Sequence, residues 1–326
     1  MKINRCVEAY IARKRASGFD YVASGKVLWR FARFVGNVQI SSITEHHINL
    51  FLTRNAMSNN TWRRYVSYLS KFFVYWCARR QIGSIPQAKQ KPFVKTSFFP
   101  FIYTRSEIRR LIDAIPLCLR YSRCSMNVDT FRTILLLVYG TGMRIGDVLR
   151  ILDSHIDLRQ KTIHIQGARI QLSRDIPIGT DVERLLLRYL KKTERAKFGA
   201  GKQLFLTVGG KPVPYAVVRN SFLHIRRLAG VTRPSSSYQP RIHDLRHSFA
   251  VHSIASWERD SLSPEKMLPI LAAYMGNVNL EGFGRYLELA PSSYKSQLES
   301  LRVRPRLRAS LNKIAPSVHR SKNSLT

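Results

Sequence analysis

The amino-acid sequence predicts a mostly helical protein with a small β-sheet, of the α+β class, divided into two domains. Apolar residues recur at helical spacing through residues 1–83 and through most of residues 101–301. Residues 84–100, between these regions, hold three prolines and three lysines and no acidic residue. Two short isoleucine-rich runs within residues 162–178 are the candidate strands. We therefore expect a helical domain over 1–83, a basic linker over 84–100, a larger domain over 101–301 and a basic tail over 302–326.

The helices of residues 1–83 are predicted from apolar stripes along one face. The fourth helix has the longest stripe, with successive apolar positions three or one residues apart. The stripe consists of Trp62, Tyr65, Val66, Leu69, Phe72, Phe73 and Trp76. Aromatic residues at helical spacing are usually buried, so we interpret them as core and not as a platform that stacks on bases.

Residues 101–301 contain the predicted strands and further helices. Thr104-Arg-Ser-Glu107 is a capping box, which predicts the start of a helix. Ser263 and Pro264 predict another start, with serine as N-cap and proline at the first helical position. A buried helix is expected over 131–139, and strands are expected over 162–165 and 170–178. Amphipathic helices are expected over 180–192, 216–228, 245–254, 264–275, 280–287 and 292–301.

The charge of the chain indicates a polyanionic partner. There are 54 Lys and Arg against 20 Asp and Glu, a formal net charge of +34. Residues 1–100 hold 17 basic and 3 acidic residues, and residues 301–326 hold 7 basic and no acidic residue. Nucleic acid is the expected partner, because each neutralised phosphate releases counterions; a solvated basic surface or a membrane surface are the alternatives. The candidate contacts are Arg63, Arg64, Lys71, Lys89, Lys91 and Lys95.

Several classes of protein are disfavoured. No apolar run approaches the roughly 18–20 residues that span a bilayer, and the first residues lack a secretory signal. The four cysteines form no CxxC pair, so we interpret them as reduced thiols and not as a disulfide or metal framework. The sequence predicts a cytoplasmic, nucleoid-associated protein that does not bind a membrane.

A glycine-containing turn follows the buried helix predicted over 131–139. Its sequence is Gly140-Thr-Gly-Met-Arg144-Ile-Gly-Asp147. The glycines permit a tight turn that places Arg144 at the opening of the next helix, where it could bind a phosphate. Asp147 lies on the same helix face and could orient a guanidinium group. Taken alone, the motif also fits an ordinary turn with a surface arginine.

Histidine and arginine cluster at His243-Asp-Leu-Arg246-His247. His243 and Arg246 are three residues apart and share one face of a helix. An imidazole beside a permanent cation suits proton transfer next to a phosphate. A single histidine is more often structural, and the clustering weakens that alternative without removing it. His243 and Arg246 are therefore catalytic candidates, with His247 as a supporting residue.

A third motif joins Gly276-Asn277 to Tyr286, nine residues later. A tyrosine in an amphipathic helix usually serves packing. As a nucleophile it must lose a proton, and its ordinary pKa is about 10. Cations near the oxygen would lower that pKa and would also bind a target phosphate.

The order of these motifs resembles the tyrosine recombinases, the family of phage integrases, chromosome-dimer resolvases and transposon recombinases. Residues 141–147, TGMRIGD, are similar to the family's first arginine box, and residues 243–247, HDLRH, to its second. The interval from Asn277 to Tyr286 matches that between its third box and its nucleophile. The resemblance covers nearly the whole chain and implies a helical core-binding domain followed by a catalytic domain.

Two positions depart from the family pattern. The third box usually reads Gly-His, sometimes with Trp in place of His, whereas Asn277 donates hydrogen bonds but carries no charge. The family also has a lysine five residues before an Arg-x-φ-Pro-φ stretch, in which φ is apolar. Residues 174–178, RDIPI, fit that stretch, so Arg169 occupies the lysine position. Arginine is a poor general acid, and Lys161 at the start of the hairpin is the alternative.

The resemblance implies that DNA strands are cut and rejoined without metal, ATP or another cofactor. Tyr286 would form a 3′-phosphotyrosyl link, which a 5′-hydroxyl of a partner strand then attacks. Arg144 and Arg246 would hold the phosphate oxygens, while His243 would accept the tyrosyl proton or position the phosphate. The expected partners are double-stranded DNA and further protomers in a tetramer, identical or related. The expected origin is a bacterial or phage-like mobile element.

Three other functions stay open. A type IB topoisomerase shares this chemistry, although the core-binding domain and the helix predicted over 292–301 favour recombination. A DNA-binding accessory protein without catalysis would explain Asn277 and Arg169. A basic RNA-binding protein would explain the charge but not the ordered motifs. The tail over 302–326 would bind DNA or stay disordered.

Overall fold

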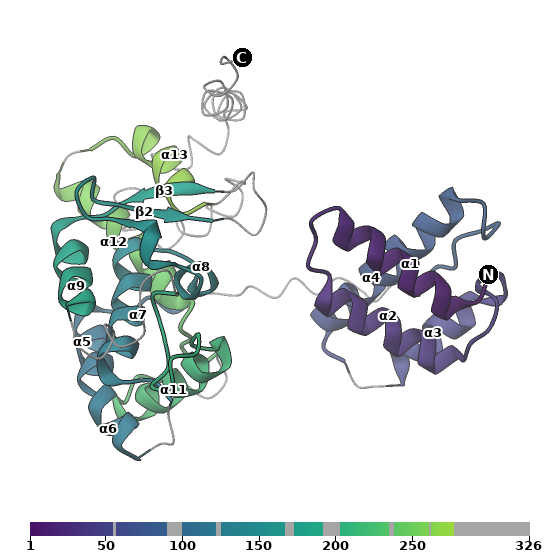
Figure 1. Ribbon diagram of the computed structural model, residues 1–326, viewed down its shortest axis with the longest axis horizontal. Coiled ribbons are helices and arrows are strands. Elements are labelled where there is room, and N and C mark those ends of the chain that lie inside the picture. Colours follow the sequence, from purple (N-terminus) through teal and green to yellow (C-terminus); the bar gives the residue numbers. More distant parts are fainter. Residues whose placement is uncertain are drawn as a thin grey trace. The chain divides into compact units, whose positions relative to one another are not determined.

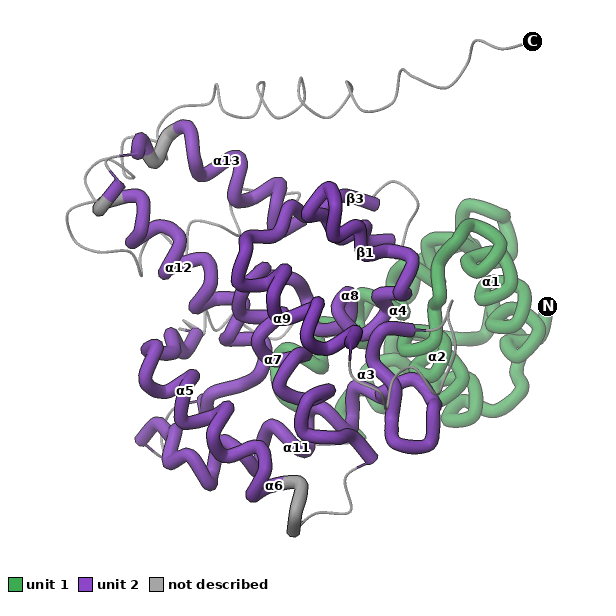
Figure 2. Tube along the Cα trace, turned by 60° about the vertical axis from the view of Figure 1, so that its left-hand side comes forward, with its two compact units in different colours: residues 1–98 green, residues 99–326 purple. Residues whose placement is uncertain are grey.

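The computed structural model describes residues 1–54, 57–89, 100–121, 125–166, 173–191, 203–234, 238–260 and 262–276. The fold is mostly helical with one small antiparallel sheet, as the sequence predicts (Figure 1). The chain divides into two compact units, residues 1–98 and 99–326, and this division falls within the predicted linker (Figure 2). The predicted helices over 280–287 and 292–301 and the tail lie outside the described residues.

The first unit is built from helices around an aromatic core. They are α1 (Ile3–Ala16), α2 (Val22–Val35), the 3-10 turn η1 (Ile40–Ser42), α3 (Glu45–Thr53) and α4 (Asn59–Ala78). The apolar stripe predicted for α4 is confirmed as core, since Trp62, Leu69, Phe72, Phe73 and Trp76 are buried. Arg63, Arg64 and Lys71 are exposed on the same helix. α4 therefore separates an apolar face from a basic one.

The second unit surrounds a central helix, α7 (Val128–Thr141), whose Phe131, Ile134 and Leu137 are fully buried. α7 packs against α6, α8, α9 and α12 (Figure 1). The helices are α5 (Arg105–Asp113), α6 (Ile115–Tyr121), α7, α8 (Ile145–Leu149), α9 (Thr180–Leu190), α11 (Tyr215–Leu228), α12 (Asp244–Arg259) and α13 (Pro264–Tyr274), with the 3-10 turn η2 (Asp153–His155). α12 extends beyond the predicted 245–254 because Trp257 and Ile254 bury against α13.

The sheet has three antiparallel strands in the order β1-β2-β3. They are β1 (Ile156–Asp157), β2 (Thr162–Ile165) and β3 (Arg174–Pro177). Thr162 pairs with Pro177 and Ile165 with Arg174. β2 has the predicted bounds, whereas β1 was not predicted because two residues show no alternation. Within the described residues, the strand predicted over 170–178 is limited to β3.

Two helix starts test the capping signals in the sequence. At α5, Thr104 N–H donates to Glu107 Oε2 at 2.8 Å and Glu107 N–H donates to Thr104 Oγ1 at 3.2 Å, which confirms the capping box. At α13, Ser263 and Pro264 occupy the predicted positions, but the Ser263 side chain accepts no capping hydrogen bond. The predicted helix start, with Ser263 as the N-cap residue and Pro264 at the beginning of the helix, is confirmed without that hydrogen bond. No helix among the described residues is both long and apolar enough to cross a bilayer.

Candidate active site

The turn between α7 and α8 places Arg144 at the edge of the second unit. α7 ends at Thr141, and the next residue, Gly142, caps it with a φ of +61° that favours glycine. A Cβ atom at Gly142 would overlap the Phe249 ring on α12. Glycine is therefore needed for the backbone conformation and for the close approach of α12. Arg144 is the residue immediately before α8.

Two arginines from distant segments are tied to the same turn. Arg246 on α12 is 2% exposed and donates from Nη1 to the Gly142 carbonyl oxygen at 2.6 Å. Arg144 is exposed and donates from Nη2 to the Gly276 carbonyl oxygen at 2.9 Å. The three sequence motifs thus meet in space, since Gly142, Arg246 and Gly276 belong to the first, second and third of them. Negative charge that develops near the two guanidinium groups would be stabilised by their positive charge.

His243 is held next to these cations just before α12 begins. Its ring lies 5.0 Å from the His247 ring, centroid to centroid, at 87°. Burial lowers the pKa of His243, and the positive charge of Arg246 lowers that pKa further, while Asp244 opposes the shift. The imidazole is therefore neutral near neutral pH and able to accept a proton.

Hydrogen bonds hold the start of α12 in place, and they come from residues that the sequence motifs did not identify as functional. Asp244 is 2% exposed and accepts hydrogen bonds from Arg241 N–H at 2.9 Å and from Arg241 Nη2 at 3.1 Å. Tyr103 N–H donates to Ser248 Oγ at 2.8 Å, and the Tyr103 hydroxyl donates to the Arg241 carbonyl oxygen at 3.0 Å. The two Tyr103 contacts join segments more than a hundred residues apart, so no local pattern could have revealed them.

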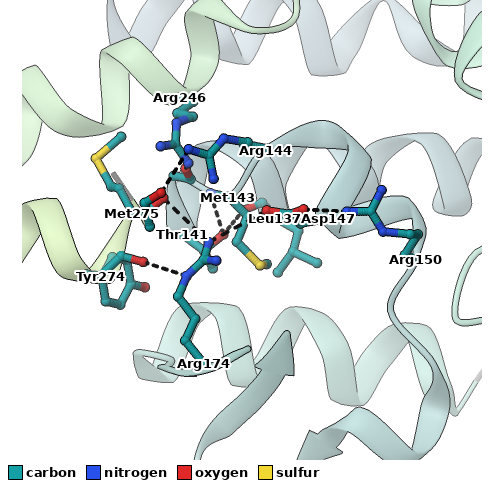
Figure 3. Close-up of polar contacts among 12 residues, drawn as sticks. Leu137, Thr141, Met143, Arg144, Asp147, Arg150, Arg174, Arg246, Tyr274 and Met275 are labelled. Carbon is teal, nitrogen blue, oxygen red and sulfur yellow. Dashed lines mark hydrogen bonds and ion pairs between the residues drawn. The ribbon is translucent and has the colours of Figure 1, made fainter. Parts of the chain in front are cut away.

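Asp147 contacts two guanidinium groups in the structure. Its Oδ1 lies 2.7 Å from Arg150 Nη2 and its Oδ2 lies 3.6 Å from Arg174 Nη2 (Figure 3). Arg174 also donates from Nε to the Tyr274 carbonyl oxygen at 3.3 Å. From the sequence, Arg174 was identified only as the first residue of the RDIPI stretch, and no role in the site was predicted for it.

Lys161 lies at the end of the hairpin away from Arg174. It has a φ of +50° and its Nζ forms an ion pair with Glu183 Oε2 on α9 at 2.9 Å. Its carbonyl oxygen accepts from Ile178 N–H at 2.8 Å. Arg169, Asn277 and Tyr286 lie outside the described residues.

A second basic surface lies wholly within the first unit. A pocket of about 850 Å³ is lined by Arg30, Arg33, Phe34, Phe51, Arg54, Met57 and Tyr65. Arg30 Nη1 donates to the Tyr65 hydroxyl at 3.2 Å, and Arg54 lies over the Phe34 ring at 5.6 Å. Its three arginines are exposed. Sequence reasoning missed them because they come from α2 and the end of α3. Of the predicted linker contacts, Lys89 is exposed, whereas Lys91 and Lys95 lie outside the described residues.

Comparison with known proteins identifies the second unit. Residues 103–256 match the model of the phage integrase family. The second unit carries a phage integrase family domain. Among curated relatives, "Putative integrase/recombinase y4rB" of Sinorhizobium fredii is 26% identical and covers 92% of this chain and 97% of its own length. The tyrosine recombinase XerC of Staphylococcus carnosus is 25% identical over 78% of this chain and 83% of its own.

Solved tyrosine recombinase structures share the fold. The Tn1549 transposon integrase in complex with a circular intermediate DNA has a TM-score of 0.63 at 16% identity, covering 91% of this chain and 99% of its own. A lambda integrase dimer bound to a core site has a TM-score of 0.59 at 16% identity, covering 86% and 96%. The fold class and the family resemblance expected from the sequence are both confirmed.

Proposed function

We propose that this protein is a site-specific DNA recombinase that cuts and rejoins strands through a 3′-phosphotyrosyl link on Tyr286. The observation that carries the proposal is the meeting of Arg144, Arg246 and His243 around the glycines of the first and third motifs. Two cations and a neutral imidazole at one turn are the groups that in-line attack on a phosphodiester needs.

In the proposed reaction, the Tyr286 oxygen attacks the scissile phosphorus and the bond to the 5′-oxygen breaks. His243 accepts the tyrosyl proton. Its lowered pKa keeps the imidazole neutral at neutral pH, so a ring nitrogen is available to take that proton. Arg144 and Arg246 bind the non-bridging oxygens as negative charge develops. The released 5′-oxygen takes up a proton from solvent, because no arginine of the site can give one up. A 5′-hydroxyl of a partner strand later reverses these steps. The phosphodiester energy is kept in the covalent link.

Two supporting assignments complete the site. We assign Asn277 a hydrogen bond to a phosphoryl oxygen. We assign the hairpin position facing the leaving group to Arg169, acting electrostatically, because the Lys161 ammonium is engaged by Glu183. Tyr274 is disfavoured as the nucleophile, since burial raises its pKa to about 12 and its hydroxyl donates to the Pro177 carbonyl oxygen at 3.1 Å.

The proposed partner is double-stranded DNA, bound by both units. We propose that residues 1–83 are the core-binding domain. The pocket arginines and the basic face of α4 would contact the phosphates of the DNA backbone. Residues 101–301 would be the catalytic domain. A related structure is a lambda integrase tetramer bound to a Holliday junction, with a TM-score of 0.60 at 15% identity. A tetramer, of this chain or with related recombinases, is accordingly the proposed active assembly, acting on a mobile element in the cytoplasm.

Trapping the covalent link tests the proposal. A pool of duplexes with a randomised core and a nick on one strand is incubated with the full chain in the presence of a chelator. Wild-type protein should form a denaturation-resistant DNA adduct, which Tyr286→Phe abolishes. Tyr294→Phe, at the next tyrosine in the chain, is the matched control and should keep the adduct. Salt-sensitive DNA binding without any adduct would contradict catalysis and favour an accessory DNA-binding role.

A further inference from the structure

The Arg174 guanidinium lies where three segments of the candidate active site meet. Arg174 begins β3, and its side chain is 18% exposed. It donates from Nε to the Tyr274 carbonyl oxygen at 3.3 Å and from Nη2 to the Met275 carbonyl oxygen at 3.5 Å. The same Nη2 lies 3.6 Å from Asp147 Oδ2 on α8. One planar group therefore joins the sheet, α8 and the C-terminal end of α13 (Figure 3).

Gly276 lies directly against this guanidinium. A Cβ atom at Gly276 would be 2.6 Å from Arg174 Cζ and 2.7 Å from its Nη1, so only glycine permits the contact. The φ of Gly276 is +67°, which also favours glycine. The Gly276 carbonyl oxygen accepts the hydrogen bond from Arg144 at 2.9 Å. Two arginines thus hold one residue, Arg174 against its Cα atom and Arg144 at its carbonyl oxygen.

We propose that Arg174 is a positioning residue that fixes the turn at Gly276, and through it the Arg144 guanidinium. This role rests on the proposed function, because it matters only if Arg144 binds the scissile phosphate. A lysine could not replace Arg174, since one ammonium cannot meet two carbonyl oxygens and a carboxylate in one plane. A misplacement of about 1 Å in such a site costs about 100-fold in rate.

Arg150 provides a matched control. It contacts the same carboxylate, with Nη2 2.7 Å from Asp147 Oδ1, but its side chain is 52% exposed. The contacts that distinguish Arg174 are those to residues 274–276. Arg150→Ala therefore removes a cation from Asp147 and leaves the proposed positioning contacts in place.

The first measurement follows the turn itself, by amide hydrogen exchange of the full chain without DNA. Met275 N–H donates to the Leu271 carbonyl oxygen and Gly276 N–H to that of Ala273, each at 2.9 Å. In Arg174→Ala these two amides should exchange about tenfold faster or more, and in Arg150→Ala at the wild-type rate. Equal exchange in the two variants would overturn the proposal, whether or not the protein cuts DNA.

The second measurement follows the reaction, as the rate of adduct formation at saturating nicked DNA. Arg174→Ala should be about 100-fold slower than wild type, with DNA affinity unchanged and partial rescue by added methylguanidinium. Arg174→Lys, which keeps the charge if the alanine variant unfolds, should still be about tenfold slower. Arg150→Ala should match wild type. An adduct that forms normally in both Arg174 variants would overturn the positioning role alone, whereas a wild-type protein that forms no adduct would overturn the proposed function.

Discussion

In the first unit, Arg30, Arg33 and Arg54 are exposed around a pocket with an aromatic lining, whereas in the second unit Arg246 and Arg174 are largely buried against backbone carbonyl oxygens. An exposed arginine contributes mainly charge, and neighbouring arginines can replace it. A buried arginine bonded to a carbonyl oxygen has one orientation, and the groups around it depend on that orientation. Replacing an arginine of the first unit should therefore weaken DNA binding by a small amount. Replacing a buried arginine of the second unit should slow the cleavage reaction strongly.

The largest effect is expected from Arg246→Ala. It removes a proposed phosphate ligand and leaves the Gly142 carbonyl oxygen without its 2.6 Å donor, so adduct formation should fall about 10²–10³-fold or more. The rate is measured in single turnover and corrected for the folded fraction. Arg226→Lys is the control, because Arg226 is also buried, at 8% exposure, and donates to the Pro240 carbonyl oxygen at 3.1 Å. A comparable loss of rate in that control would mean that burial, and not the site, explains the effect.

Gly142→Ala should destabilise the second unit by about 2–4 kcal/mol, as the sum of left-handed backbone strain and overlap with Phe249. The measurement is chemical denaturation of the full chain, followed through the second unit. Gly146→Ala is the control. Its added Cβ would lie 3.5 Å from Arg150 Nη1, an ordinary contact inside α8, so stability should stay equal or rise slightly. Equal losses of unfolding free energy in the two variants would show that position 142 has no special need for glycine.

A smaller effect concerns pH. Because the pKa of His243 is lowered in the folded protein, the unfolded chain binds more protons below about pH 6.5, and the free energy of unfolding should fall as the pH falls through that value. His243→Gln should remove this dependence, so that the free energy of unfolding falls less between about pH 7 and pH 5 than in the wild type. Urea denaturation of both proteins at these pH values measures it. Parallel pH profiles would show that His243 is not held neutral.

The smallest effect is expected from Arg33→Ala in the first unit. DNA affinity should fall only several-fold, and the slope of log K against log salt should decrease by about one. Fluorescence anisotropy with labelled duplex at several salt concentrations gives both quantities. The adduct rate at saturating DNA should not change. A slope equal to that of wild type would show that the pocket arginines do not contact phosphates.

The sequence predicted features that depend on local spacing. The α4 core stripe, the bounds of β2 and the capping box at Thr104 all follow from residues a few positions apart, and the structure confirms them. The motifs around Arg144 and Arg246 were found from the sequence in the same way, with help from the family resemblance. Their proposed roles stay predictions.

Features that depend on tertiary contacts could not be predicted. Arg174 is 100 residues from Tyr274, and no period or spacing links them. The pocket of the first unit is similar, because Arg33 and Arg54 lie on different segments and become neighbours only when α2 and α3 pack. At Ser263 a local signal correctly predicts where the helix begins, but the side-chain hydrogen bond that is usual for a serine N-cap does not form.

The most direct test of the account identifies the amino acid that becomes linked to DNA. The trapped adduct is digested with nuclease and trypsin, and the nucleotide-bearing peptide is sequenced by mass spectrometry. Cleavage after Arg285 and Lys295 gives residues 286–295, which contain both Tyr286 and Tyr294, so fragment ions must assign the linkage. We predict a nucleotide joined through its 3′-phosphate to the Tyr286 oxygen. A nucleotide on Tyr294 or on any other residue, or DNA cleavage with no covalent link, would contradict it.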